Sequence, residues 1–189
     1  MTIDLNKGEG FNLDLTKQVN FDIALQWAYN RSGVDIDLDV SAFMLKQVGD
    51  KRKLTSTSDI VFFNNKQSAC GSVKLSGDSR DGASDGDDEV ISINTSLIPA
   101  DVVQINIYIN IFAPKVTFSK VDSAKAQVRT SDGRTVAQVN MSTDFQNENS
   151  LFVGSISKVS NNWTFTAGGE GYVVEDLNTI VKALHTEGV

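Results

Sequence analysis

Two short acidic runs hold the side chains with the clearest potential for chemistry in this chain. The first, VDIDLDV, places Asp35, Asp37 and Asp39 at alternate positions among apolar residues. On a β-strand this spacing puts the three carboxylates on one face, about 7 Å apart in succession. The second run, GDSRDGASDGDDE at residues 77–89, holds six acids, one arginine and three glycines that let the backbone turn tightly. Our working hypothesis is that the two runs meet around calcium.

The distribution of charge supports cation binding. The chain of 189 residues has 24 acids against 17 lysines and arginines, a net charge of −7. The two runs hold nine of the acids and one arginine, which leaves 15 acids and 16 bases elsewhere. A generally acidic, solubilising surface would spread its excess charge along the chain. This concentration of negative charge argues for a bound cation and against nucleic acid as a partner.

Neither run is an EF-hand, because neither has the ligand spacing of that calcium loop. Counting from Asp35, position six is Val40 instead of glycine and position twelve is Lys46 instead of glutamate. Counting from Asp81, position twelve is Ser92. A calcium site would therefore have to be built between the two runs.

Other chemistries have weaker signals. The single cysteine, Cys70, allows no intrachain disulfide and no cysteine-based zinc site, and the one histidine, His185, lies far in sequence from any candidate nucleophile. We expect no enzymatic activity. Three rival functions remain open: a metal-dependent hydrolase that uses the same carboxylates, a module that binds a small ligand or cyclic nucleotide, and an interaction module whose acids only solvate it.

Periodic apolar residues predict an all-β fold. The longest strand, VVQINIYINIF, alternates Val103 and four isoleucines with polar residues, and NFDIALQWA at 20–28 alternates in the same way and is expected to form a hairpin with the first acidic run. Asp132-Gly133 and the segment around Ser160 predict two further hairpins. Residues 46–59 are expected to form a loop. Only residues 174–184 have helical spacing.

These elements together indicate a two-sheet antiparallel β-sandwich with a C-terminal helix and short helical turns. We expect one domain over residues 1–189. The N-terminal residues lack a basic stretch followed by an apolar run, and no segment approaches the roughly 18 apolar residues of a membrane span. A cytoplasmic protein without direct membrane insertion is therefore expected.

The paired runs, with the segments around them, resemble the TerD-like tellurite-resistance and stress-response family. That family combines a D-x-D-x-S-A-F strand with a later GDN-x-TG-x-G-x-GDDE loop. LNKGEGFNLDL, FFNN, IPADVVQINIYINIF and LFVGSISKVSNNWTFTAGGEGY also match its pattern, so the resemblance covers nearly the whole chain. The family is a β-sandwich that binds calcium between these loops and has no established enzymatic activity.

The resemblance implies calcium as cofactor and a protein partner in a stress-response or phage-defence system. Matching acidic positions are Asp37, Asp39, Asp78, Asp85, Asp87, Asp88 and Glu89. Asp35 extends the first run, and Asn64 offers a further oxygen. Ser79 and Asp81 stand where the family has asparagine and threonine, and Ala83 and Ser84 replace an acidic residue and a glycine. The predicted metal ligands are Asp35, Asp37, Asp39, Asn64, Asp78, Ser79, Asp81, Asp85, Asp87, Asp88 and Glu89.

Overall fold

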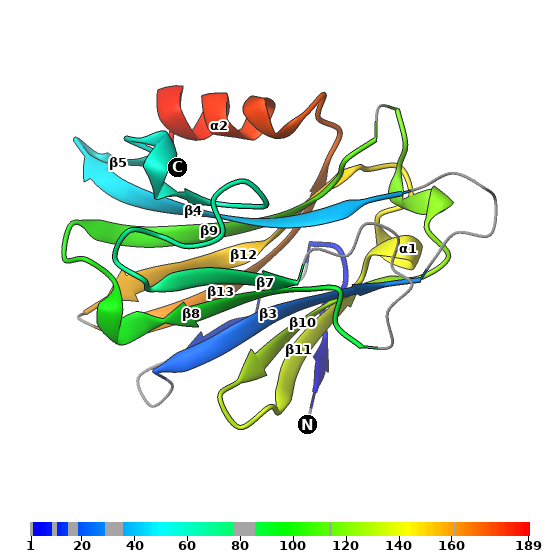
Figure 1. Ribbon diagram of the computed structural model, residues 1–189, viewed down its shortest axis with the longest axis horizontal. Coiled ribbons are helices and arrows are strands. Elements are labelled where there is room, and N and C mark those ends of the chain that lie inside the picture. Colours follow the sequence, from blue (N-terminus) through cyan, green and yellow to red (C-terminus); the bar gives the residue numbers. More distant parts are fainter. Residues whose placement is uncertain are drawn as a thin grey trace.

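Two β-sheets stack face to face in the computed structural model, which describes residues 2–8, 11–14, 19–28, 36–77, 86–113, 115–160 and 162–189 (Figure 1). The first sheet has the order β1-β11-β10-β3-β8-β7. The second has the order β2-β13-β12-β9-β4-β5, and the short β6 also pairs with β4. The strands of the first sheet are β1 (Ile3–Asp4), β3 (Asn20–Trp27), β7 (Val73–Gly77), β8 (Glu89–Asn94), β10 (Ala124–Thr130) and β11 (Thr135–Asn140). The strands of the second are β2 (Asn12–Asp14), β4 (Leu38–Val48), β5 (Lys51–Lys53), β6 (Ile60–Val61), β9 (Val102–Ile111), β12 (Ser150–Val159) and β13 (Asn162–Tyr172).

The main core lies between the sheets, where the alternating strands predicted from sequence place their apolar faces. Phe21, Ile23, Leu25 and Trp27 of β3 are at most 3% exposed, and the isoleucines of β9 belong to the same cluster. Alternation on a strand directs every second side chain to one face, so these strands cover each other's apolar surface. The predicted β-sandwich is confirmed.

A second apolar cluster covers the outer face of the second sheet. There α2 (Leu177–Thr186) packs Ile180 and Leu184 against Phe43, Leu45 and other residues of the sheet (Figure 1). Asp176 caps this helix by accepting a hydrogen bond from the Thr179 amide at 3.2 Å. Both faces of β9 are consequently buried, including Asn106 and Asn110 on its polar side.

Shorter helical segments complete the described structure. They are α1 (Met141–Asp144) and three 3₁₀ turns at Thr57–Asp59, Thr95–Leu97 and Phe118–Lys120. Within the described ranges, no helix combines the length and the apolar character needed to cross a bilayer.

Two predicted hairpins are confirmed by the strand register. Strands β10 and β11 pair across the Asp132-Gly133 turn, where Gly133 has a φ of 79° that favours glycine. Strands β12 and β13 pair from Val159 and Asn162 back to Ser150 and Tyr172.

Two other expectations are wrong. Strand β3 does not form a hairpin with the first acidic run: it pairs with β8 and β10, whereas β4 belongs to the other sheet. The polar segment after Leu45 is not a simple loop, because β4 continues to Val48 and pairs with β5. The edge strand β1 pairs with β11 in parallel, which departs from an entirely antiparallel sandwich.

Candidate functional site

The acidic runs lie at the beginnings of β4 and β8. Of the predicted ligands, Asp35, Asp78, Ser79, Asp81 and Asp85 lie outside the described residues. The other six, Asp37, Asp39, Asn64, Asp87, Asp88 and Glu89, are described. The site is therefore described from the residues that flank segment 78–85 and from the start of β4.

Glu89 connects the two runs directly. It is the first residue of β8, its exposed fraction is 1%, and its Oε2 accepts a hydrogen bond of 2.7 Å from the Val40 amide. Val40 follows Asp39 on β4 in the opposite sheet. A buried backbone amide needs an acceptor, and here a carboxylate from the other sheet supplies it. The structure thus brings the second run against the strand that carries the first.

Asp88 is held as firmly as Glu89. Asp88 is 2% exposed, and its Oδ2 accepts a hydrogen bond of 2.9 Å from the Trp27 backbone amide. Its own amide donates to the Leu25 carbonyl at 2.9 Å. These two bonds extend the pairing of β3 with β8 by one residue. The carboxylate is therefore fixed by the backbone of the central strand β3.

Gly77, the last residue of β7, allows this strand to pack closely against the backbone of Asp88. Its φ is 86°, and a Cβ atom placed on it would lie 2.2 Å from the Asp88 carbonyl oxygen. No side chain other than hydrogen fits that distance without moving the backbone. The glycine thus sets how closely the two ends of the acidic segment approach each other.

Asp87 has a cationic partner that the sequence did not indicate. Arg129 on β10 donates two hydrogen bonds to its carboxylate, with Nη2 to Oδ1 at 2.8 Å and Nη1 to Oδ2 at 2.5 Å. This bidentate geometry suits a guanidinium and a carboxylate. The charge of Asp87 is therefore already balanced within the protein.

The remaining described candidates are placed differently. Asp39 is half-buried and lies with Ser41 and Phe43 on the face of β4 that looks toward α2. The Asp37 carbonyl accepts a hydrogen bond of 2.8 Å from the Phe112 amide. Asn64 is exposed in the turn after β6. Glu89, in contrast, shares its face of β8 with the buried Ile91 and Ile93.

The predicted ligands carry the type of atom that calcium prefers. Every predicted ligand offers oxygen, and calcium prefers six to eight oxygens, whereas structural zinc prefers sulfur and nitrogen. Within the described part of the chain, no group of three or more histidine, cysteine, aspartate or glutamate side chains is arranged to hold a metal. A complete shell would therefore need ligands from residues 78–85 as well.

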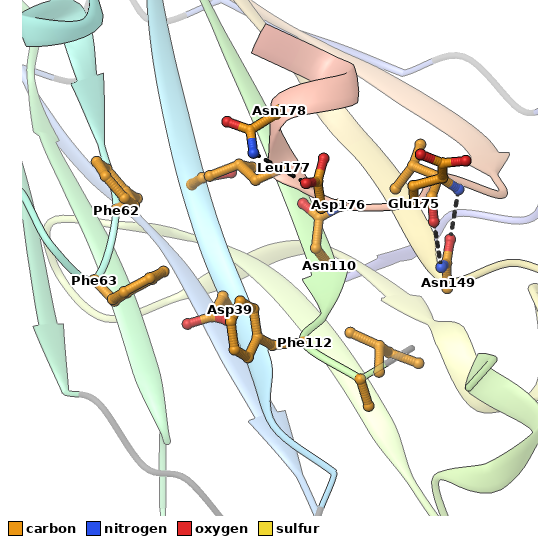
Figure 2. Close-up of a pocket in the computed structure, with 14 residues that line it drawn as sticks. Asp39, Phe62, Phe63, Asn110, Phe112, Asn149, Glu175, Asp176, Leu177 and Asn178 are labelled. Atoms are coloured by element: carbon orange, nitrogen blue, oxygen red, sulfur yellow. Dashed lines mark hydrogen bonds between the residues drawn. The ribbon is translucent and has the colours of Figure 1, made fainter. Parts of the chain in front are cut away.

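A cavity of about 510 Å³ lies on the other face of β4, beneath the beginning of α2 (Figure 2). Asp39 and Asn110, which are paired in the register of β4 with β9, both line it. Phe62 and Phe63 stand on one side and Asn149 on the other. Its volume falls within the range of small-molecule sites.

Comparison with known proteins gives the family. The family model described as "TerD domain" matches residues 1–184. This chain belongs to the TerD domain family. It is 35% identical over 179 residues to "Tellurium resistance protein TerD" of Alcaligenes sp, a match that covers 91% of this chain and 92% of that protein. It is also 33% identical over 182 residues to "General stress protein 16U" of Bacillus subtilis (strain 168), with 91% and 92% covered.

Solved structures support the same fold for this TerD-family protein. The homologue of telluride resistance protein (TerD) SCO6318 from Streptomyces coelicolor A3(2) superposes with a TM-score of 0.75. The match covers 91% of this chain and 98% of that one at 16% identity. The predicted family membership is confirmed, and with it the relation to tellurite-resistance and stress-response proteins.

Sequence reasoning about this TerD-family chain missed three groups near the acidic runs. The Val40 amide and the Arg129 guanidinium hold Glu89 and Asp87, and Asn110 lines the neighbouring cavity. Arg129 lies 42 residues from Asp87 in an ordinary alternating strand, so no local pattern marks it. Asn110 carries a weak signal, because a strand whose polar side chains lie on the face toward a helix must bury them.

Proposed function

We propose that this TerD-family protein is a calcium-binding module rather than an enzyme. Calcium binds between the acidic run at 35–39 and the acidic segment at 77–89, and it holds these loops in one arrangement. That arrangement forms a surface for a protein partner in a stress response. The names of the relatives, which include tellurium resistance and general stress proteins, agree with such a role.

The observation that carries the proposal is the hydrogen bond from the Val40 amide to Glu89. It fixes the end of the second acidic run beside the strand of the first, although 49 residues separate the two partners. Asp88 is fixed next to it by the Trp27 amide. These two bonds hold Asp88 and Glu89 close to the strand that carries the first run, which supports a divalent cation bound between the two runs.

Like charges gathered in this way make the metal-free protein less stable. Two carboxylates 7 Å apart repel by about 2.4 kcal/mol at an effective dielectric of 20. Calcium removes that repulsion and supplies positive charge that all the predicted ligands can share. Asp88 and Glu89, with the carboxylates of 78–85, are the main proposed ligands. Asp87 contributes less, because Arg129 already balances its charge.

Thermal unfolding with calcium or with a chelator tests the proposal. A ligand at 100 times its dissociation constant adds about 2.7 kcal/mol, which corresponds to a rise in Tm of about 5 to 10 °C for a protein of this size. Magnesium at the same concentration serves as the control for general screening. Equal midpoints with calcium and with chelator would contradict calcium binding.

Matched variants locate the site. Asp88→Asn removes one buried charge at the acidic end, and Asp50→Asn removes one exposed charge from the turn between β4 and β5. Isothermal titration should give weaker calcium binding for Asp88→Asn and unchanged binding for Asp50→Asn. An equal loss of calcium affinity in both variants would mean that calcium binding depends only on the net charge of the protein.

The partner surface is tested separately. A tagged wild-type chain should retain its partner from cells of the source organism in calcium and release it in chelator, while Asp88→Asn should retain less than wild type in calcium. Retention that is independent of calcium would leave the metal site intact but remove its proposed role in partner binding.

A further inference from the structure

The floor of the cavity contains a buried amide with no hydrogen-bond partner. Asn110 is 8% exposed, and neither its Oδ1 nor its Nδ2 has a partner among the described residues. Asn149 in the same cavity is 7% exposed but makes two hydrogen bonds to the Val174 backbone, at 2.8 and 2.9 Å. Leaving a buried amide unsatisfied destabilises a fold. The fold thus supplies hydrogen-bond partners for the side-chain amide of Asn149 but, among the described residues, none for that of Asn110.

Aromatic rings form one wall of the cavity. Phe62 and Phe63 pack edge to face with centroids 5.2 Å apart, and Phe63 and Phe112 continue the row at 5.9 Å. Figure 2 shows Phe112 beside Asp39, at the end of this row. Phe112 is 67% exposed, which is high for a large apolar side chain. The wall therefore offers an accessible face to a flat apolar group.

The charge around the cavity is negative. Asp39, Glu175 and Asp176 are among its lining residues, and the described lining contains no lysine, arginine or histidine. Asp176 is occupied as the cap of α2, and its hydrogen bond from Asn178 holds the pKa of its carboxyl below the usual value. A phosphate or carboxylate would meet repulsion here and find no cationic partner.

These carboxylates do not form a second metal site. They are spread over β4 and the start of α2, and no metal-holding group of three such side chains exists within the described ranges. The cavity combines an apolar aromatic wall with a few polar groups, which is the composition of a site for an organic molecule.

We propose that this cavity binds a small planar organic molecule, neutral or cationic, that carries adjacent hydrogen-bond donor and acceptor groups. Its flat part packs on Phe63 and Phe112. Its donor and acceptor pair with Oδ1 and Nδ2 of Asn110, so that the ligand supplies the partners that the fold does not. Anionic ligands of the same shape are rejected by Asp39 and Glu175. This site lies on the face of β4 toward α2 and shares Asp39 with the first acidic run.

Three probes of equal shape but different charge test the proposal: benzamide, benzamidine and benzoate. Each is titrated into the isotope-labelled full chain, with and without calcium, while the side-chain amide signals of Asn110 are followed by NMR. Those signals are assigned by their loss in Asn110→Leu. Benzamide and benzamidine should shift them saturably, with dissociation constants of the order of 1 mM expected for fragments. Benzoate should bind at least tenfold more weakly.

Binding of benzoate as tight as that of benzamide would overturn the proposed selectivity for neutral and cationic ligands. Failure of both benzamide and benzamidine to shift the Asn110 signals would overturn the proposal itself. A result that depends on calcium would show coupling of the two sites and would leave the ligand class as proposed.

Two substitutions separate a binding role for Asn110 from a structural one. Asn110→Leu should abolish binding of benzamide and leave the melting temperature unchanged or higher, because it replaces unpaired polar atoms with a side chain of similar size. Asn149→Leu should lower the melting temperature, since it breaks both bonds to Val174. Phe112→Ala should weaken binding without lowering the melting temperature. If Asn110→Leu unfolds as early as Asn149→Leu, Asn110 is structural and the proposal is wrong.

Discussion

The acidic end and the cavity lie on either side of the first residues of β4, and they differ in how far backbone amides bind their buried polar side chains. At the acidic end, Asp88 and Glu89 each accept a hydrogen bond from a backbone amide of another strand. In the cavity, both polar atoms of Asn110 lack such a partner among the described residues. A buried charge is far more costly than a buried amide, so the backbone bonds to Asp88 and Glu89 matter more for stability than a bond to Asn110 would.

The largest effect is expected from closing the space at Gly77. In Gly77→Ala the new methyl group would clash with the Asp88 carbonyl oxygen, and alanine would have to adopt a positive φ. We therefore expect the free energy of unfolding to fall by about 3 to 5 kcal/mol. Gly133→Ala is the matched control, because Gly133 has a similar φ but open space around its Cβ position. The free energy of unfolding of Gly133→Ala should fall by only about 1 kcal/mol. Urea unfolding of both variants measures the difference, and equal losses would mean that the acidic end is not tightly packed.

The comparison between the two regions is tested by one substitution in each. Glu89→Leu leaves the buried Val40 amide without its acceptor and should lower the free energy of unfolding by about 2 kcal/mol in chelator. Asn110→Leu should change it by no more than about 1 kcal/mol, in the stabilising direction. Chemical denaturation in the same buffer gives both values. The contrast fails if the two variants lose similar stability.

The smallest effect concerns the pH dependence that Asp176, one of the residues lining the cavity, gives to stability. The hydrogen bond from Asn178 lowers the pKa of Asp176, so the ionised carboxyl is favoured in the folded state. Its stabilising contribution is complete above the unfolded pKa near 3.8 and is lost as pH falls through the lowered folded value. The melting temperature of wild type should therefore fall more than that of Asp176→Asn between pH 5 and about 3. Parallel curves would show that the cap does not depend on this charge.

The sequence predicted the features that depend on local pattern. Alternation in 20–28 and in 102–111 identified β3 and β9, and the Asp132-Gly133 step identified one hairpin, because backbone geometry links these patterns to strands and turns. The acidic runs were recognisable because their charge is concentrated. Family membership followed from the same motifs.

Other features depend on which surfaces meet, and local pattern does not encode that. The alternation of β3 says nothing about its partners, so the expected hairpin with β4 was wrong. The partner of Asp87 comes from β10, and the cavity exists because α2 lies over β4 and β9. Asn110 is one of several polar residues on its strand, and it differs from Asn106 because Asn106 accepts a hydrogen bond from the Gln104 side-chain amide at 2.6 Å, whereas the polar atoms of Asn110 have no partner among the described residues.

The strand order also has a consequence for synthesis on the ribosome. Strand β3 ends at Trp27, but its neighbours are β8, which begins at Glu89, and β10, which begins at Ala124. At a translation rate of about 5 to 20 residues per second, the second neighbour emerges roughly 5 to 20 s after β3. During that interval at least one edge of β3 lacks the strand that pairs with it in the folded protein. We expect the nascent chain to depend on chaperones at this stage, and folding to be slow because distant segments must meet first.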